Sequence, residues 1–210
     1  MSVTILYLVM LLTFGVSLSA CVGLSQAELH LNDGNKYFKL GQSQLAIRHY
    51  DAAIRLDPEY ASAYANRGNA YIEMGQPEQA LQDLDEAIRL EPNDGVAYNS
   101  RGYAYKQLGQ FPQAIQDLDE AIQLNPQYSL AYNNRGFYYA NLGQLGQALR
   151  DYEEAIRLNP QYGGAYANRA IAYTLLDEDT RAKQDVVRAL EHGIDAAFIN
   201  DAIDQIRRQR

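Results

Sequence analysis

The chain has 210 residues, a formal net charge of −8 and one cysteine. An acidic balance argues against binding to nucleic acid, because that function requires clustered lysine and arginine side chains. It also argues against attachment to a membrane through a polybasic surface. A single cysteine excludes a disulfide within the chain, and the length is enough for one or two ordinary domains.

The chain begins with an uncharged, mostly apolar stretch. Residues 3–20 contain no charged side chain and end in the small residues Ser19 and Ala20, directly before Cys21. An apolar stretch of this length followed by small residues indicates a secretory signal rather than part of the folded domain. Two alternatives stay open: the stretch is just long enough to span a bilayer as an uncleaved anchor, or the product is secreted in soluble form.

The four residues Leu18-Ser19-Ala20-Cys21 resemble the lipobox of bacterial lipoproteins. The resemblance implies that the signal is cleaved before Cys21, that the cysteine sulfur carries a diacylglycerol and that the new amino terminus is acylated. Several acyl chains together give a stable membrane anchor. Val22 rather than Asp follows the cysteine, which in a Gram-negative cell implies the periplasmic face of the outer membrane. The first four residues depart from the family because they contain no Lys or Arg.

Beyond this segment the chain repeats itself. The stretch Tyr64–Pro92 returns as Tyr98–Pro126 and Tyr132–Pro160, at a step of 34 residues. An earlier copy ends at Pro58, and a later one begins at Tyr166 and decays after Leu190. A fixed period of this length predicts a solenoid in which each unit packs mainly against its neighbours.

The repeat resembles the tetratricopeptide repeat from Ala27 to about His192. The resemblance implies an all-α fold, an α-α superhelix of five helix-turn-helix repeats followed by a C-terminal capping helix. We therefore divide the chain into a signal peptide (1–20), a lipidated tether (21–26), repeats at 27–60, 61–94, 95–128, 129–162 and 163–193, the last of them degenerate, and a capping helix (194–210).

Each repeat contains two helical segments, which in the second repeat are Ala61–Met74 and Pro77–Leu90. Gly75 lies where the first helix should end, and glycine there can adopt a left-handed C-terminal cap. Pro77 lies at the start of the second helix, where its missing N–H costs nothing, and Pro112 has the same role one repeat later. Pro92 ends the second helix, since the residue before a proline avoids the helical region.

A repeating glycine and a stripe of small and large residues predict how the two helices meet. Gly68 has no side chain, so the second helix can approach closely there, and Ala80, Leu84, Ala87 and Ile88 form the facing stripe. We expect nine tyrosines to pack in the core rather than to form a stacking platform. They are Tyr37, Tyr71, Tyr105, Tyr139 and Tyr173 at one position, and Tyr64, Tyr98, Tyr132 and Tyr166 at the other.

Four repeats carry an arginine next to the glycine position and an aspartate 16 residues later. In an antiparallel helix pair these positions lie at about the same level. We predict one structural ion pair in each of these repeats, of modest value unless it is partly buried. The pairs are Arg67 with Asp83, Arg101 with Asp117, Arg135 with Asp151, and Arg169 with Asp185; the first repeat has Asp33 and His49 instead.

The last repeat loses its glycine, its Leu-Gly turn and its closing proline. It is followed by Ile194–Ile206, which places Phe198, Ile199, Ala202, Ile203 and Ile206 on one face. This pattern predicts an amphipathic capping helix. The basic tail Arg207, Arg208 and Arg210 suits a helix C-terminus.

In the family, the first helices of the repeats line a concave groove that holds a peptide of a partner protein. Carried over by position, the resemblance implies a binding surface of Asn66, Asn69, Val96, Ser100, Tyr103, Lys106, Leu130, Asn134, Phe137, Asn141 and Asn168. Asparagine can both donate to and accept from a peptide backbone.

Tyr103 and Phe137 replace the family's asparagine in two successive repeats, which indicates anchors for an apolar side chain of a partner. The alternative is that they pack against a C-terminal extension or a second copy. The Lys/Arg clamp for C-terminal carboxylates found in co-chaperone members is absent, since the equivalent positions hold Leu31, Asn35, Asn66, Val96 and Ser100.

No pattern of catalytic or metal-ligating residues emerges. The three histidines, His30, His49 and His192, are expected to lie apart without a shared partner, and no phosphate-binding loop is present. We expect no enzyme activity, metal, cofactor or small-molecule substrate. The sequence favours a membrane-tethered adaptor that binds a protein segment; the alternative is a self-associating scaffold without a peptide ligand.

Overall fold

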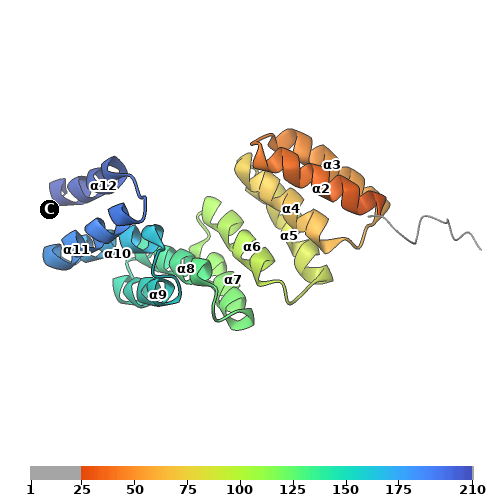
Figure 1. The fold of residues 1–210 in the computed structure, drawn as a ribbon. Helices are drawn as coiled ribbons and strands as arrows, with labels where there is room; N and C mark the ends of the chain where they lie inside the picture. Colours follow the sequence, from red (N-terminus) through yellow and green to blue (C-terminus); the bar gives the residue numbers. More distant parts are fainter. Residues whose placement is uncertain (1–24, 210) are drawn as a thin grey trace, which may run out of the picture.

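The computed structural model describes residues 25–209, which form eleven helices and no strand (Figure 1). The expected signal peptide, Cys21 and most of the expected tether lie outside the described residues. Within residues 25–209 no helix combines the length and apolar character needed to cross a membrane. The helices are α2 (Gln26–Lys39), α3 (Ser43–Leu56), α4 (Ala61–Glu73), α5 (Pro77–Leu90), α6 (Gly95–Gln107), α7 (Phe111–Leu124), α8 (Ser129–Asn141), α9 (Leu145–Leu158), α10 (Gly163–Leu175), α11 (Asp179–Glu191) and α12 (Ala196–Arg208).

The helices form successive hairpins. We call α2, α4, α6, α8 and α10 the A helices, and α3, α5, α7, α9 and α11 the B helices. Each A helix packs against its own B helix and against the B helix before it, and neighbouring A helices also touch. Figure 1 shows the pairs following one another from α2 and α3 at one end to α11 and α12 at the other. The all-α solenoid expected from the repeat is therefore confirmed.

Each A helix ends in a tight turn that the sequence encodes. Gly75 has a φ of +68°, and the backbone N–H groups of Gln76 and Gly75 donate to the carbonyls of Tyr71 and Ile72 at 2.9 and 3.0 Å. This is the double hydrogen bond of a Schellman cap. In the fifth repeat Asp177 takes the same conformation with a φ of +63°. Pro77 is the first residue of α5, as expected, whereas Pro112 is the second residue of α7.

The core is built on a glycine that faces a large side chain. A Cβ atom added to Gly68 would lie 2.9 Å from Leu84 Cγ, and one added to Gly136 would lie 2.8 Å from the ring of Tyr152. The fully buried side chains at this B-helix position are Tyr50, Leu84, Leu118 and Tyr152. In the fifth repeat Ala170 replaces the glycine and the smaller Val186 stands opposite. The two positions therefore compensate each other in volume.

The nine tyrosines expected in the core are less buried than the sequence suggested. Of this set only Tyr173 is buried, and the others are half-buried. Five of them lie over the arginine of their own repeat, as in Tyr64, whose ring centroid lies 5.6 Å from Arg67 Cζ. Except for Tyr173, these rings cover a guanidinium while staying partly exposed to solvent. The deep core is instead alanine plus the large side chains opposite the glycines.

Each of the four arginines donates hydrogen bonds to the aspartate of its own repeat, and three of them also bind an aspartate of the repeat before. Arg67 Nε and Nη2 donate to the two carboxylate oxygens of Asp83 at 2.7 and 2.6 Å. Its Nη1 donates at 2.6 Å to Asp51 of the preceding repeat, a contact that the sequence analysis did not anticipate. Arg101 and Arg135 repeat the arrangement with Asp85 and Asp117, and with Asp119 and Asp151. Arg169 binds Asp185 through two hydrogen bonds.

We call the four arginines and the aspartates that they bind the arginine ladder. Its groups are charged, and the aspartate of each arginine's own repeat is buried. The hydrogen bonds from Arg67 to Asp83 raise the pKa of the guanidinium, which therefore stays protonated. Burial raises the pKa of the Asp83 carboxyl, because desolvation outweighs the hydrogen bonds from Arg67. Since desolvation offsets much of the attraction, the ladder fixes the level of each helix against two others more than it adds net stability.

The first repeat replaces this network by a histidine pair. His30 and His49 stand at the positions of Tyr64 and Asp83, and their Nδ1 atoms lie 3.4 Å apart. The ring of Tyr37 stacks on His49 with centroids 5.1 Å apart. The expectation that the histidines lie apart is therefore wrong for these two, because both belong to the same helix hairpin. His192 lies elsewhere and stacks on Tyr166.

The capping helix α12 follows α11 and packs against α10. Asp195 caps its N-terminus, and Ile199 and Ile203 are buried. Phe198 was expected on the same apolar face but is 64% exposed. At the positions of Tyr166, Ala170 and Tyr173, α12 carries Asn200, Asp204 and Arg207. These polar residues lie toward α11, where Arg207 Nη2 donates to Asp179 Oδ1 at 3.0 Å, so α12 does not repeat the packing of an A helix.

The glycine contact predicts an asymmetry between two alanine substitutions. Gly136→Ala places a methyl group against the buried ring of Tyr152, and such overpacking costs about 1–3 kcal/mol. Gly146→Ala in α9 meets nothing within 4 Å, so it should be neutral or stabilise by up to about 1 kcal/mol. Urea unfolding followed by circular dichroism measures both. Equal stability of the two variants would contradict the packing described here.

The ladder predicts that one arginine is coupled unequally to its two aspartates. The side chain of Arg135 is 18% exposed, that of Asp151 8% and that of Asp119 54%. In double-mutant cycles of Arg135→Leu with Asp151→Ala, we expect a coupling of about 1–3 kcal/mol. The same arginine with Asp119→Ala should show about 0.2–1 kcal/mol, because that pair is screened by water. Additive effects for Arg135 and Asp151 would reject their pairing.

Candidate protein-binding groove

The A helices present one row of side chains on the side away from their B helices, which we call the A-helix stripe. The sequence-predicted residues on it differ in accessibility. Val96, Tyr103, Leu130, Phe137 and Asn141 are exposed; Asn66, Asn69, Lys106, Asn134 and Asn168 are partly buried; Ser100 is buried. Ser100 therefore lies beneath the surface that a partner could touch.

The asparagines of the stripe join neighbouring A helices. Asn66 Nδ2 donates to Asn35 Oδ1 at 2.9 Å, and Asn134 Nδ2 donates to Asn99 Oδ1 at 2.9 Å. Asn168 Nδ2 donates to Asn133 Oδ1 at 3.0 Å. One amide hydrogen of each is thus used within the fold, a role that spacing alone did not reveal. In residues 25–209 the carbonyl oxygens of these three side chains accept no hydrogen bond, so that they remain available to a peptide N–H.

Two aromatic rings and a lysine form a cluster in the middle of the stripe. Tyr103 is 39% and Phe137 37% exposed. Lys106 Nζ lies 4.7 Å from the ring centroid of Tyr103 and 5.8 Å from that of Phe137. A cation over a ring face at these distances is attracted by about 0.5–1 kcal/mol at an exposed site. The three residues, which come from α6 and α8, therefore hold one another in place on the surface.

A cavity of about 220 Å³ opens beside this cluster, between α8 and α10. Phe137 forms one wall, and Ile171 and Leu175 form the opposite one. Ile171 and Leu175 are not among the residues predicted from the sequence, although they stand one repeat after Phe137 and Asn141. Extending the stripe by one step of 34 residues into the degenerate fifth repeat would have found them.

The N-terminal end of the stripe is polar. A cavity of about 430 Å³ there is lined by Asn32, Asn35, Lys36, Lys39 and Leu40 of α2. The next repeat continues with Asn66, Asn69 and Glu73, and Glu73 accepts a hydrogen bond from Ser43 at 2.9 Å. The stripe is thus polar over the first two repeats, whereas over the next three it combines asparagines and one cation with large apolar side chains.

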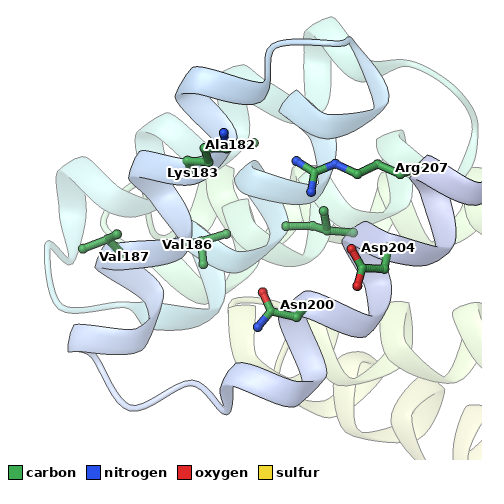
Figure 2. A pocket seen from close by; sticks show the side chains of 8 residues that line it. Ala182, Lys183, Val186, Val187, Asn200, Asp204 and Arg207 are labelled. Atoms are coloured by element: carbon green, nitrogen blue, oxygen red, sulfur yellow. The ribbon is translucent and has the colours of Figure 1, made fainter.

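A further cavity of about 430 Å³ lies at the C-terminal end, between α11 and α12 (Figure 2). Val186, Val187 and Ile203 supply its apolar lining, and Lys183, Asp204 and Arg207 lie at its edge. Val187 and Ile203 stand where the preceding repeats carry the ladder's aspartate and arginine. The ladder therefore ends at this interface, and the cavity is separate from the A-helix stripe.

Within the part of the chain that the structure describes, no group of three or more His, Cys, Asp or Glu side chains is arranged to hold a metal ion.

Burial raises the pKa of Tyr50 to about 12 and raises the pKa of Tyr138 and Tyr152 as well. These phenols are neutral core groups. The stripe thus offers hydrogen-bonding, apolar and cation contacts suited to a polypeptide.

Solved structures with the same fold are numerous. MamA is 29% identical to this chain with a TM-score of 0.67, and the match covers 76% of this chain and 93% of that one. YrrB, described as a TPR protein with an unusual peptide-binding site, is 24% identical with a TM-score of 0.64, covering 82% and 89%. PilF of Pseudomonas aeruginosa is 20% identical with a TM-score of 0.77, covering 88% and 90%. The comparison with curated protein sequences found no match.

The repeat itself matches two family models. A model described as TPR repeat matches residues 34–75, and the tetratricopeptide repeat model matches residues 61–94, 95–128 and 129–162. Together these matches cover residues 34–162, more than half of the chain. The 34-residue period of these matches corresponds in the structure to the capped helix hairpin with its glycine contact, which recurs once in each repeat. The chain therefore belongs to the tetratricopeptide repeat family, whose members mediate protein–protein interactions.

Proposed function

We propose that this protein is a non-enzymatic adaptor that holds a segment of a partner protein in a concave groove formed by its A helices. A lipid on Cys21 tethers it to the bacterial envelope, at the periplasmic face of the outer membrane in a Gram-negative cell. There it assembles or recruits other envelope proteins. The observation that carries the proposal is the exposed aromatic pair Tyr103 and Phe137 on the A-helix stripe.

Exposed aromatic rings on an ordered surface favour a binding role over a purely structural one. Apolar area removed from water contributes about 25 cal/mol per Å², and the packing of this fold leaves more than a third of each ring exposed. Aromatic residues that become buried at the centre of an interface often dominate its binding energy. A partner segment that covers Tyr103 and Phe137 would recover the energy that the fold leaves unused.

The tether places the groove close to the membrane. Only residues 22–24 separate Cys21 from Ser25, whose side chain caps α2. The four residue steps from Cys21 to Ser25 span at most about 14 Å when fully extended. A lipid-anchored Cys21 would therefore hold the first hairpin, α2 and α3, next to the lipid headgroups, with the remaining repeats extending from it.

A second candidate function is a self-associating scaffold without a peptide ligand. It is favoured by the C-terminal end, where α11 and α12 form a cavity with a valine and isoleucine lining and where Phe198 of α12 is exposed. Sedimentation of the mature chain over a range of concentrations separates the two functions. A mass that rises with concentration supports the scaffold, and a strict monomer supports the adaptor.

Site-specific cross-linking tests the groove. A photo-reactive amino acid placed at Tyr103 or Phe137 in the native host should cross-link to a defined partner, because these side chains would lie under the bound segment. The matched control is Gln116, an exposed residue of α7 on a B helix, which should not give this product. The double variant Tyr103→Ala/Phe137→Ala should lower recovery of that partner at least about tenfold, since loss of aromatic anchors costs about 2 kcal/mol or more. An unchanged set of partners would reject the groove.

The tether is tested separately. Cys21→Ser removes the sulfur that would carry the diacylglycerol, so the protein should move from the detergent-rich to the aqueous phase and lose lipid-derived mass. Mass spectrometry of the wild-type protein should find Cys21 at the amino terminus with attached acyl chains. An unmodified Cys21 in a chain that keeps residues 1–20 would contradict the lipid anchor without affecting the groove.

A further inference from the structure

The A-helix stripe changes its chemistry along the solenoid. In the first two repeats it carries amides and charged groups, including Asn35, Asn66 and Glu73. In the next three repeats it also carries exposed or half-buried apolar residues, which are Val96, Tyr103, Leu130, Phe137, Ile171 and Leu175, beside Lys106 and the asparagines. A partner segment lying along the stripe therefore meets an apolar half that can select among partner side chains.

The cavity between α8 and α10 has the size and lining of a site for one large apolar side chain. Its volume is about 220 Å³, and an apolar cavity of about 150 Å³ is already enough for a benzene ring. The fully buried Tyr152 and Ala172 form its base. The two amides at its edge each use an N–H within the fold, since Asn141 Nδ2 donates to the Phe137 carbonyl at 2.7 Å and Asn168 Nδ2 donates to Asn133. The lining that faces a ligand is therefore mainly apolar.

Lys106 brings a positive charge to the edge of this cavity. Its ammonium lies over the rings of Tyr103 and Phe137, and Phe137 is also a wall of the cavity. No carboxylate of residues 25–209 lies within ion-pair distance of Lys106. Ring faces attract the cation without neutralising it. On a chain of net charge −8, this ammonium is a local site for a negative group.

We propose that repeats three to five recognise a segment that combines a large apolar side chain with a nearby acidic one. The apolar side chain (Leu, Ile, Met or Phe) enters the cavity against Phe137, Ile171 and Leu175. An Asp or Glu of the same segment pairs with Lys106 across the ring of Phe137. The ring of Phe137 lies between Lys106 and the cavity. Because an extended chain advances about 3.3 Å per residue, the apolar and the acidic residue of the segment should be no more than about three positions apart. This inference rests on the proposed function and adds the chemistry of the partner.

The test is a selection of displayed short random peptides on the full-length chain, purified in mild detergent and immobilised. Enriched peptides should carry a large apolar residue with Asp or Glu within three positions of it. Lys106→Glu should replace the acidic preference by a basic one and weaken the original peptides at least about tenfold. Ile171→Gln/Leu175→Gln should abolish the apolar preference. The matched control is Lys183→Glu, which makes the same change of charge on α11, away from the stripe, and should leave the selection unchanged.

Two failures are distinguishable. Peptides that depend on Tyr103 and Phe137 but show no apolar–acidic pattern, or that ignore Lys106→Glu, overturn this inference and leave the proposed function standing. A selection in which no peptide depends on Tyr103 and Phe137 overturns both. Circular dichroism and thermal melting verify that each variant is folded. If Ile171→Gln/Leu175→Gln does not fold, Leu175→Ala removes one exposed wall of the cavity and should weaken the selected peptides at least about tenfold.

Discussion

The close approach of two helices at a glycine is the constraint on which the rest of this structure depends. Where the A helix has no side chain, the B helix inserts its largest buried residue, Leu84 in the second repeat and Tyr152 in the fourth. Because the two surfaces interlock at this level, the hairpin has one register, and every repeat reproduces it. The fifth repeat keeps the interlock with a larger Ala170 and a smaller Val186, which shows that the combined volume of the pair matters more than either residue.

The register allows the polar contacts to repeat as well. Each of Arg67, Arg101 and Arg135 binds an aspartate of its own repeat and one of the repeat before it. Amide pairs such as Asn66 with Asn35 join neighbouring A helices in a similar way. An ion pair with one buried carboxylate gains little net energy, but it is sensitive to position, so these contacts define how far each hairpin is rotated and shifted relative to the last.

The core and the polar contacts between hairpins involve other faces of the helices than the exposed part of the A-helix stripe. The B helices and the inner faces of the A helices supply the core and the ladder, and the stripe adds amide pairs such as Asn66 with Asn35, so its exposed side chains are not needed to hold the solenoid together. The stripe can therefore vary from repeat to repeat, from amides near α2 to Tyr103, Phe137 and Leu175 further along. At the C-terminal end, α12 carries Asn200 and Arg207 at the sequence positions where an A helix has tyrosines. The regular series of hairpins ends there.

The sequence by itself determined the all-α solenoid, the approximate ends of its helices and the close packing at the glycines, because these follow from a 34-residue period with glycine, proline and alanine at fixed places. It overstated the burial of the tyrosines, of which only Tyr173 is buried. It also placed the four arginines beside their aspartates, since that contact lies within one hairpin. Only the tertiary structure decided the contacts between hairpins, which are the second aspartate of Arg67, Arg101 and Arg135 and the cavity formed with Ile171 and Leu175. It also decided two details of side-chain placement, the His30–His49 pair and the exposure of Phe198. The physical reason is that such contacts depend on the angle between successive hairpins and on how each side chain is rotated, and a repeat pattern specifies neither.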